Sequence, residues 1–173
     1  MSTETENTSP CANLPSPVKA HEWLQKFVGE WTTEAEFGCG EPGQPPAKAS
    51  GTESTRMIGG FWIVAHGMGE MPDMPPYHSV LTLGYDPEKQ KYIGTWIDSM
   101  TSYLWKYEGE VDASGRILKL ETEGFFPGAP DKLTKFEEVT EFIDDDHRVF
   151  TSSTVGDDGS RNTMITIHFY RKK

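Results

Sequence analysis

Apolar and polar residues alternate along most of the chain from residue 30 onward, in short runs rich in Val, Ile, Thr, Tyr, Phe and Trp. Such a period of two is typical of strands that bury one face. Gly, Pro and Asp, which favour turns, separate the runs. The pattern predicts about ten strands, at residues 30–37, 50–58, 61–70, 77–85, 91–98, 101–109, 116–123, 132–142, 148–155 and 161–171.

The segment before these runs has a helical period. Ser16-Pro17 resembles an N-cap followed by a proline in the first helical turn, and apolar residues recur at helical spacing as far as Val28. Gly29 then ends the predicted helix. Residues 1–16 are mostly Ser, Thr, Asn, Pro and Glu, which cannot bury enough apolar area to order the chain. We therefore expect a disordered tail over 1–16 and one domain over 17–173.

The connections between the predicted strands are short, which favours an antiparallel meander. Twisted strands without helices to cover a face close most simply on themselves, because closure removes the exposed sheet edges. The sequence therefore predicts an all-β protein, a roughly ten-stranded antiparallel up-and-down barrel with one short N-terminal helix.

Charge and hydropathy exclude several classes of partner. The 173 residues include 16 Lys+Arg and 27 Asp+Glu, a formal charge of −11, which repels nucleic acid and anionic membranes. No apolar run is long enough to span a membrane, and residues 1–10 lack the features of a secretory signal. We expect a cytoplasmic protein that binds neither nucleic acid nor membrane, and we leave a monomer and a homodimer open.

Gly29-Glu30-Trp31, at the head of the first strand, resembles the Gly-x-Trp motif of calycins, the lipocalin-like barrels. This resemblance implies that Trp31 lies across the closed end of the barrel and that a basic residue near the end of the last strand, Arg171, packs over it. If Arg171 faces inward, alternation places Phe169 inward and His168 outward.

From His21 to Lys173 the chain resembles the bacterial family called domain of unknown function 1579. The matching segments are His21-Glu22-Trp23-Leu24, Val28-Gly29-Glu30-Trp31, Leu83-Gly84-Tyr85-Asp86-Pro87, Thr95-Trp96-Ile97-Asp98-Ser99-Met100 and Tyr107-Glu108-Gly109. The resemblance implies a calycin-like barrel and no established activity. The chain is also distantly similar to nitrobindin, a calycin barrel that holds haem through a histidine. Nitrobindins have a glycine-rich pattern after Gly-x-Trp, whereas residues 32–37 contain no glycine, so we expect no haem or other cofactor.

Candidate binding residues come from the alternation in residues 96–107. Tyr103, Trp105 and Tyr107 alternate with polar and charged residues, so they are predicted to face one way and to border an internal cavity. The alternative is that these aromatics only fill a small barrel. Asp98 follows Trp96 in alternation and either points into the interior or bonds the next turn.

One further strand contributes candidates whose orientation the pattern leaves open. Trp62 and His66 share a face of residues 61–70, but both faces of that strand are apolar. The complete predicted ligand-binding set is Trp62, His66, Trp96, Asp98, Met100, Tyr103, Trp105 and Tyr107. No residue is assigned to a metal, because His21-Glu22 begins like the zinc-protease motif but Gln25 stands where the second histidine is required.

These observations favour a non-enzymatic barrel that binds a small, mostly apolar or amphipathic ligand. The first alternative is an enzyme that uses Asp98 or His66 as an acid–base group in the same cavity. The second is a haem protein like nitrobindin. No catalytic residue is assigned, because no motif arranges a nucleophile with its base.

Overall fold

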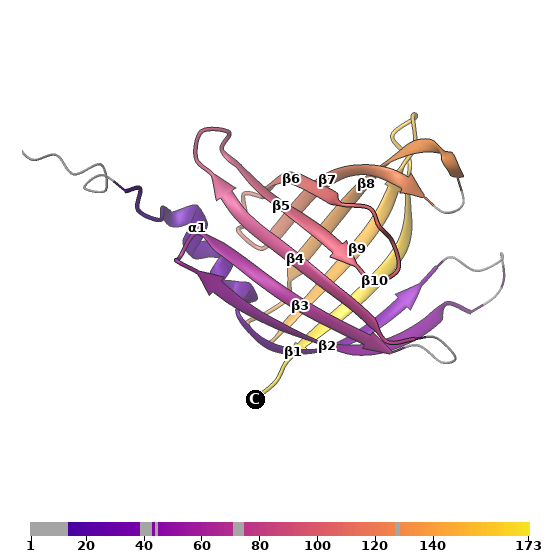
Figure 1. The fold of residues 1–173 in the computed structure, drawn as a ribbon, viewed down its shortest axis with the longest axis horizontal. Coiled ribbons are helices and arrows are strands. Elements are labelled where there is room, and N and C mark those ends of the chain that lie inside the picture. The colour runs from indigo at the N-terminus through magenta and orange to yellow at the C-terminus, as the bar shows by residue number, and fades with distance from the viewer. Residues whose placement is uncertain (1–13, 39–42, 44, 71–74, 127–128) are drawn as a thin grey trace, which may run out of the picture.

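The computed structural model describes residues 14–38, 43, 45–70, 75–126 and 129–173. Most of the predicted tail over 1–16 lies outside these residues. One short helix, α1, continues into a 3₁₀ turn, η1, and strands follow to the C-terminus (Figure 1). The elements are α1 (Lys19–Trp23), η1 (Leu24–Phe27), β1 (Gly29–Phe37), β2 (Ala47–Ile58), β3 (Trp62–Glu70), β4 (Tyr77–Asp86), β5 (Lys91–Asp98), β6 (Trp105–Val111), β7 (Ile117–Phe126), β8 (Ala129–Phe142), β9 (His147–Val155) and β10 (Arg161–Arg171).

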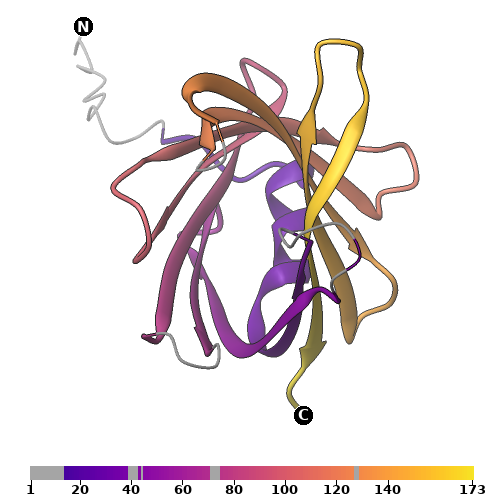
Figure 2. The same ribbon diagram turned by 90° about the vertical axis from the view of Figure 1, so that its right-hand side faces the viewer.

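The ten strands form a closed barrel in which each strand pairs antiparallel with its neighbours in the chain. The pairing of β1 with both β2 and β10 closes the ring. Figure 2 shows the ring of strands with the helical segment inside its outline. This arrangement confirms the predicted up-and-down barrel with one short helix.

The largest difference from the predicted elements is β6, which begins at Trp105 rather than at residue 101. The cause is the carboxylate of Asp98, whose Oδ1 accepts hydrogen bonds from the backbone N–H groups of Met100, at 2.8 Å, and Thr101, at 3.0 Å. These bonds hold a turn after β5, and the next strand begins at Trp105.

The strand registers define which side chains face the interior. Cross-strand partners point to the same side of a sheet, and the fully buried Trp31 is paired with Glu53 on β2 and Arg171 on β10. Continued around the ring, the registers assign one alternating set of positions on every strand to the interior. Ile63 on β3 and Leu83 on β4 belong to this set, and both are fully buried.

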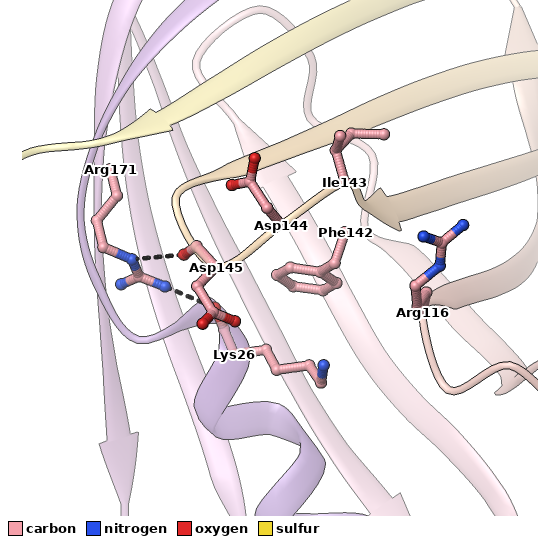
Figure 3. Close-up of a pocket in the computed structure, with 7 residues that line it drawn as sticks. All are labelled: Lys26, Arg116, Phe142, Ile143, Asp144, Asp145 and Arg171. Carbon is pink, nitrogen blue, oxygen red and sulfur yellow. Dashed lines mark hydrogen bonds between the residues drawn. The ribbon is translucent and has the colours of Figure 1, made fainter.

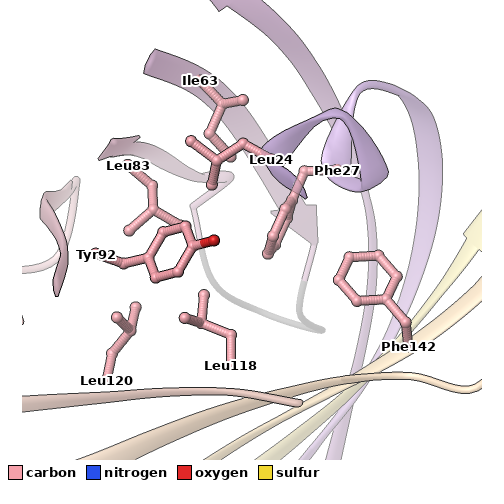
Figure 4. Close-up of a cluster of buried hydrophobic side chains, with 8 residues drawn as sticks. All are labelled: Leu24, Phe27, Ile63, Leu83, Tyr92, Leu118, Leu120 and Phe142. Atoms are coloured by element: carbon pink, nitrogen blue, oxygen red, sulfur yellow. The ribbon is translucent and has the colours of Figure 1, made fainter. Parts of the chain in front are cut away.

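One end of the barrel is filled by apolar side chains beneath the helical segment. The cluster, drawn in Figure 4, combines residues of η1 with inward residues of five strands: Leu24, Phe27, Ile63, Leu83, Tyr92, Leu118, Leu120 and Phe142. Two long-range hydrogen bonds anchor α1 there, from Trp23 Nε1 to the Gly115 carbonyl and from the Tyr92 hydroxyl to the Ala20 carbonyl. We call this the helical end, and the opposite end the open end.

At the helical end, Arg171 packs over Trp31 with its guanidinium carbon 4.1 Å from the ring centre. Its Nη1 and Nη2 donate to the carbonyls of Val28, at 2.6 Å, and Lys26, at 3.1 Å. Gly29 has a φ of +135°, and a Cβ there would lie 2.5 Å from Arg171 Nη1. The structure therefore confirms the arrangement that the calycin resemblance implies.

His168 lies on the outer face, as alternation predicts. It hydrogen-bonds His147 at 3.0 Å, and both rings stack with Tyr170.

Among the described residues, no helix has the length and apolar character needed to cross a membrane.

Candidate functional site

The registers bring four of the predicted site residues to the interior. Trp96 is paired with the inward residue Leu81, and Asp98 with the buried Ser79. Trp96 is in turn paired with Trp105, and Gly94 with Tyr107. Trp96, Asp98, Trp105 and Tyr107 therefore lie on the inner face of β5 and β6.

Trp62 and His66 lie on the outer face, so the expectation that they join the interior site is wrong. The inward residues of β3 are Ile63 and Ala65, which are 0% and 2% exposed, whereas Trp62 is 39% exposed. The Trp62 ring packs across Gly84 on the outside of β4. Ile63 joins the cluster beneath the helical segment, and this packing selects between two equally apolar faces.

Met100 is also not brought into the interior, because it lies in the turn after β5 and is 61% exposed. Tyr103 lies before β6, where its hydroxyl donates to the Glu123 carbonyl at 3.0 Å. Its ring packs edge-on against Trp105, and it lines a surface hollow with Leu104, Lys106 and Glu123. The three aromatics thus do not form one face: Trp105 and Tyr107 point inward, and Tyr103 packs at the rim.

Asp98 combines the two roles that the sequence left open. It is an inward residue, and Oδ2 accepts a hydrogen bond from Trp96 Nε1 at 3.2 Å. Its Oδ1 holds the following turn. The carboxylate is therefore fixed on the inner wall near the open end by the turn and the indole together.

Glu138, on β8, is a buried interior carboxyl that the sequence analysis missed. It is paired with the inward Leu120 and is 8% exposed. Ser152 Oγ donates to its Oε1 at 2.9 Å, while Oε2 has no hydrogen-bond partner among the described residues. Burial raises the pKa of Glu138 to about 7, and the Ser152 hydrogen bond opposes this rise. A near-neutral pKa makes this carboxyl responsive to any charge placed beside it.

Two tyrosines lie within electrostatic range of this carboxyl. Burial raises the pKa of Tyr77 and of Tyr107, and the negative charges of Asp98 and Glu138 raise both further. The phenols therefore stay neutral and keep their hydroxyl hydrogens. On β7, next to β8, the inward Oγ1 of Thr122 is buried and has no partner among the described residues. We call Tyr77, Asp98, Tyr107, Thr122 and Glu138 the polar cluster.

The basic residues that face inward, Arg148 and Arg171, have partners outside the polar cluster. Arg148 on β9 is 3% exposed and forms an ion pair with Glu53, whose Oε1 also accepts from Thr55. The Arg148 guanidinium lies 3.6 Å from the centre of the Phe169 ring. Burial lowers the pKa of Arg148, and the charge of Glu53 opposes this. Arg171 is bound to backbone carbonyls at the helical end.

A signal for Glu138 was present in the alternation of β8. Phe136, Glu138, Thr140 and Phe142 share one face, and Lys135, Glu137 and Glu141 share the other. The face with two phenylalanines and one charge is the more apolar, so it should turn inward and carry Glu138 with it.

Several inward side chains toward the open end keep partial exposure, including Leu81, Phe150, Ile165 and Ile167. Solvent therefore reaches between them. The inner face of β3 carries Gly67 and Gly69, and in the ring β3 is five strands from β8. A Cβ at Gly67 would meet Ser79 Oγ, and one at Gly69 would lie 3.5 Å from the Tyr77 ring, so side chains of β4 pack against these glycines.

A second hollow lies outside the helical end and is shown in Figure 3. Its lining is mainly charged and consists of Lys26, Arg116, Phe142, Ile143, Asp144, Asp145 and Arg171. Arg171 Nε donates to the Asp145 carbonyl at 2.9 Å, and Nη2 donates to the Lys26 carbonyl. Arg171 therefore connects the turn between β8 and β9 to the helical segment.

The described residues do not fit a haem held by a barrel histidine. His66, His78, His147 and His168 occupy outward positions of their strands. His21 is buried in α1 between the rings of Phe61 and Tyr85. No group of three or more His, Cys, Asp or Glu side chains within the described part of the chain is arranged to hold a metal ion.

The fold and the interior together define a calycin-like barrel with an aromatic wall and a buried polar cluster. The chain belongs to the family described as "Protein of unknown function (DUF1579)", whose model matches residues 16–171. No curated protein matches the sequence.

Solved structures share the fold at low sequence identity. The crystal structure of Rv2717c from M. tuberculosis has a TM-score of 0.62 and 12% identity, covering 91% of this chain and 100% of that one. A de novo designed fluorescence-activating β-barrel has a TM-score of 0.47 and 14% identity, covering 86% of this chain and 96% of that one. The likeness to Rv2717c supports the barrel fold.

Proposed function

We propose that the protein binds a small, mostly apolar or amphipathic molecule inside the barrel. Trp96, Trp105 and Tyr107 would contact its apolar body, and the polar cluster would orient its polar end. Aromatic walls with a few convergent polar groups are typical of small-molecule sites.

One observation carries this proposal: Glu138 Oε2 and Thr122 Oγ1 face inward, are buried and have no partner among the described residues. A buried polar atom without a hydrogen bond costs about 1–3 kcal/mol, so folded proteins keep few of them. A bound molecule that supplies the missing hydrogen bonds would offset this cost. The partial exposure of the inward residues toward the open end supports entry from that side.

A fluorescence titration with N-phenylnaphthylamine, a neutral apolar dye, tests the proposal. Ala49 on β2 faces inward and is half-buried, and its neighbour Ser50 faces outward. Ala49→Trp should place an indole across the interior, and Ser50→Trp should add the same group outside. We expect one dye molecule to bind the wild type and Ser50→Trp. The affinity of Ala49→Trp for the dye should be lower by about tenfold or more.

Circular dichroism of each variant confirms that it is folded. A folded Ala49→Trp that binds the dye as tightly as the wild type would place the binding site elsewhere. A wild-type protein that does not bind the dye would also contradict the proposal.

A further inference from the structure

We infer that the interior site selects organic ammonium ions, with the cationic group against Glu138 and the organic body against the aromatic residues of β5 and β6. This inference rests on the proposed function and names the chemical class of the ligand. Two observations carry it, the charges that face the interior and the unpartnered oxygen of Glu138.

The inward charges near the open end are acidic. Of the acidic residues that face the interior within the described chain, Glu53 is neutralised by Arg148. Asp98 and Glu138 have no such basic partner, because Asp98 is bound by an indole and two backbone N–H groups and Glu138 by a hydroxyl. An ionised carboxylate is costly to bury without a counter-charge. A cationic ligand supplies that charge, whereas an anionic ligand would add repulsion.

The unpartnered atom defines where the cation would lie. Glu138 is more than nine-tenths buried, and its free Oε2 is on an inward side chain of β8. An ammonium N–H donating to Oε2 would form a charge-assisted hydrogen bond, which is stronger than one between neutral groups. Thr122 Oγ1, on the neighbouring strand β7, offers a second acceptor.

The aromatic residues suit the same ligand. Trp96, Trp105 and Tyr107 share the inner face of β5 and β6, and Tyr77 lies within electrostatic range of both acids. The faces of aromatic rings attract cations, and such rings beside a carboxylate are suited to organic ammonium ions. A neutral apolar ligand would use the rings but would leave Glu138 Oε2 without a partner.

Ammonium binding should be coupled to the ionisation of Glu138. Ser152, the hydrogen-bond partner of Glu138, does not titrate in this range. Tyr77 and Tyr107 interact with the charge of Glu138, and their raised pKa values keep both phenols neutral. Asp98 acts on the same two tyrosines. Because burial raises the Glu138 pKa to about 7, raising the pH from about 6 to about 8 should increase the affinity for an alkylammonium about tenfold. The amine itself stays charged in this range.

The experiment is competition of octylamine, octanol and octanoate against bound N-phenylnaphthylamine, at pH values of about 6 and 8. The three probes share one alkyl chain and differ in the charge of the head group. Glu138→Gln removes the buried charge, and Glu121→Gln is the matched control, because it removes one charge from the exposed outer face of the adjacent strand.

For the wild type and Glu121→Gln at the higher pH, we expect octylamine to compete about tenfold better than octanol, with octanoate the weakest. In Glu138→Gln the preference for octylamine and its pH dependence should both disappear. The inference is overturned if octylamine is no better than octanol, or if Glu138→Gln keeps the preference.

These outcomes are separate from failure of the proposed function. If octylamine and octanol displace the dye equally, the proposal that the barrel binds apolar molecules stands. The inference that it selects an ammonium ion is then rejected. If the dye does not bind the wild type, calorimetric titration with octylamine alone decides the inference, and the absence of heat that depends on Glu138 rejects it.

Discussion

Arg171 covers the indole of Trp31, joining the last strand of the barrel to the first across the helical end. The Trp31 ring is fully buried, and its Nε1 donates to the Phe27 carbonyl at 2.8 Å. The last strand, the first strand and the 3₁₀ turn therefore meet at one side chain. Removing that side chain should affect all three.

Trp31→Ala should lower the free energy of unfolding by about 3–5 kcal/mol, because it leaves a cavity where a large aromatic ring is now enclosed. Trp62→Ala is the control, since Trp62 is partly exposed on the outer face. Chemical denaturation followed by circular dichroism measures both. Equal losses in the two variants would contradict the role given to Trp31.

Gly29→Ala should be more destabilising than Gly115→Ala. Both glycines have a positive φ, which costs about 1–3 kcal/mol for a residue with a Cβ. A Cβ at Gly29 would also contact Arg171 Nη1, whereas nothing lies within 4 Å of one at Gly115. Denaturation should therefore show the larger loss at Gly29, and equal losses would mean that Arg171 moves aside at no cost.

Arg148→Met should cost about 3–5 kcal/mol, because it leaves Glu53 buried without its cation. Adding Glu53→Gln to this variant should recover part of the loss. Arg161→Met, which breaks an ion pair whose arginine is exposed, should cost less than about 1 kcal/mol. A double-mutant cycle measured by denaturation gives the coupling free energy between Arg148 and Glu53. A value near zero would show that the two side chains do not stabilise each other.

The pH dependence of stability should change in Glu138→Gln. The pKa of Glu138 is about 7 in the native protein, above its ordinary value of 4.5. The native state therefore holds the proton more tightly than the unfolded state, and the contribution of this group to stability is lost as pH rises through that interval. The loss amounts to about 3 kcal/mol, from the size of the shift.

Glu138→Gln, which cannot ionise, should match the wild type at about pH 4.5 and be the more stable protein at about pH 8, by that same amount. The comparison is the difference in unfolding free energy between the two proteins at each pH, which cancels the other titrating groups. A difference that stays constant with pH would show that Glu138 titrates like an exposed glutamate.

The barrel was predictable from the sequence because alternation and turn residues are local signals. The boundary of β6 was not, because the bonds from Asp98 to the following turn depend on where its carboxylate points. In the interior, the charges of Lys106 and Glu108 placed Trp105 and Tyr107 correctly. Trp62 and His66 were misplaced because both faces of β3 are apolar, and only packing against the helical segment distinguishes them.

Glu138 illustrates a different limit. Its position on the more apolar face of β8 could be seen in the sequence. Its isolation from basic side chains and from a second hydrogen-bond donor could not. That isolation depends on Ser152 supplying a single hydrogen bond to Oε1 while Oε2 has no partner among the described residues. Ser152 lies on β9, so only the pairing of β8 with β9 brings it to Glu138.

The titration of the Glu138 carboxyl carbon, followed by nuclear magnetic resonance without and with saturating octylamine, tests the account most directly. In the free protein we predict a midpoint near pH 7, because the carboxyl is buried without a counter-charge. Octylamine should lower the midpoint by about one unit or more, because an ammonium ion in contact stabilises the carboxylate. A free-protein midpoint near the ordinary value for glutamate, or one that octylamine leaves unchanged, would contradict the interior site.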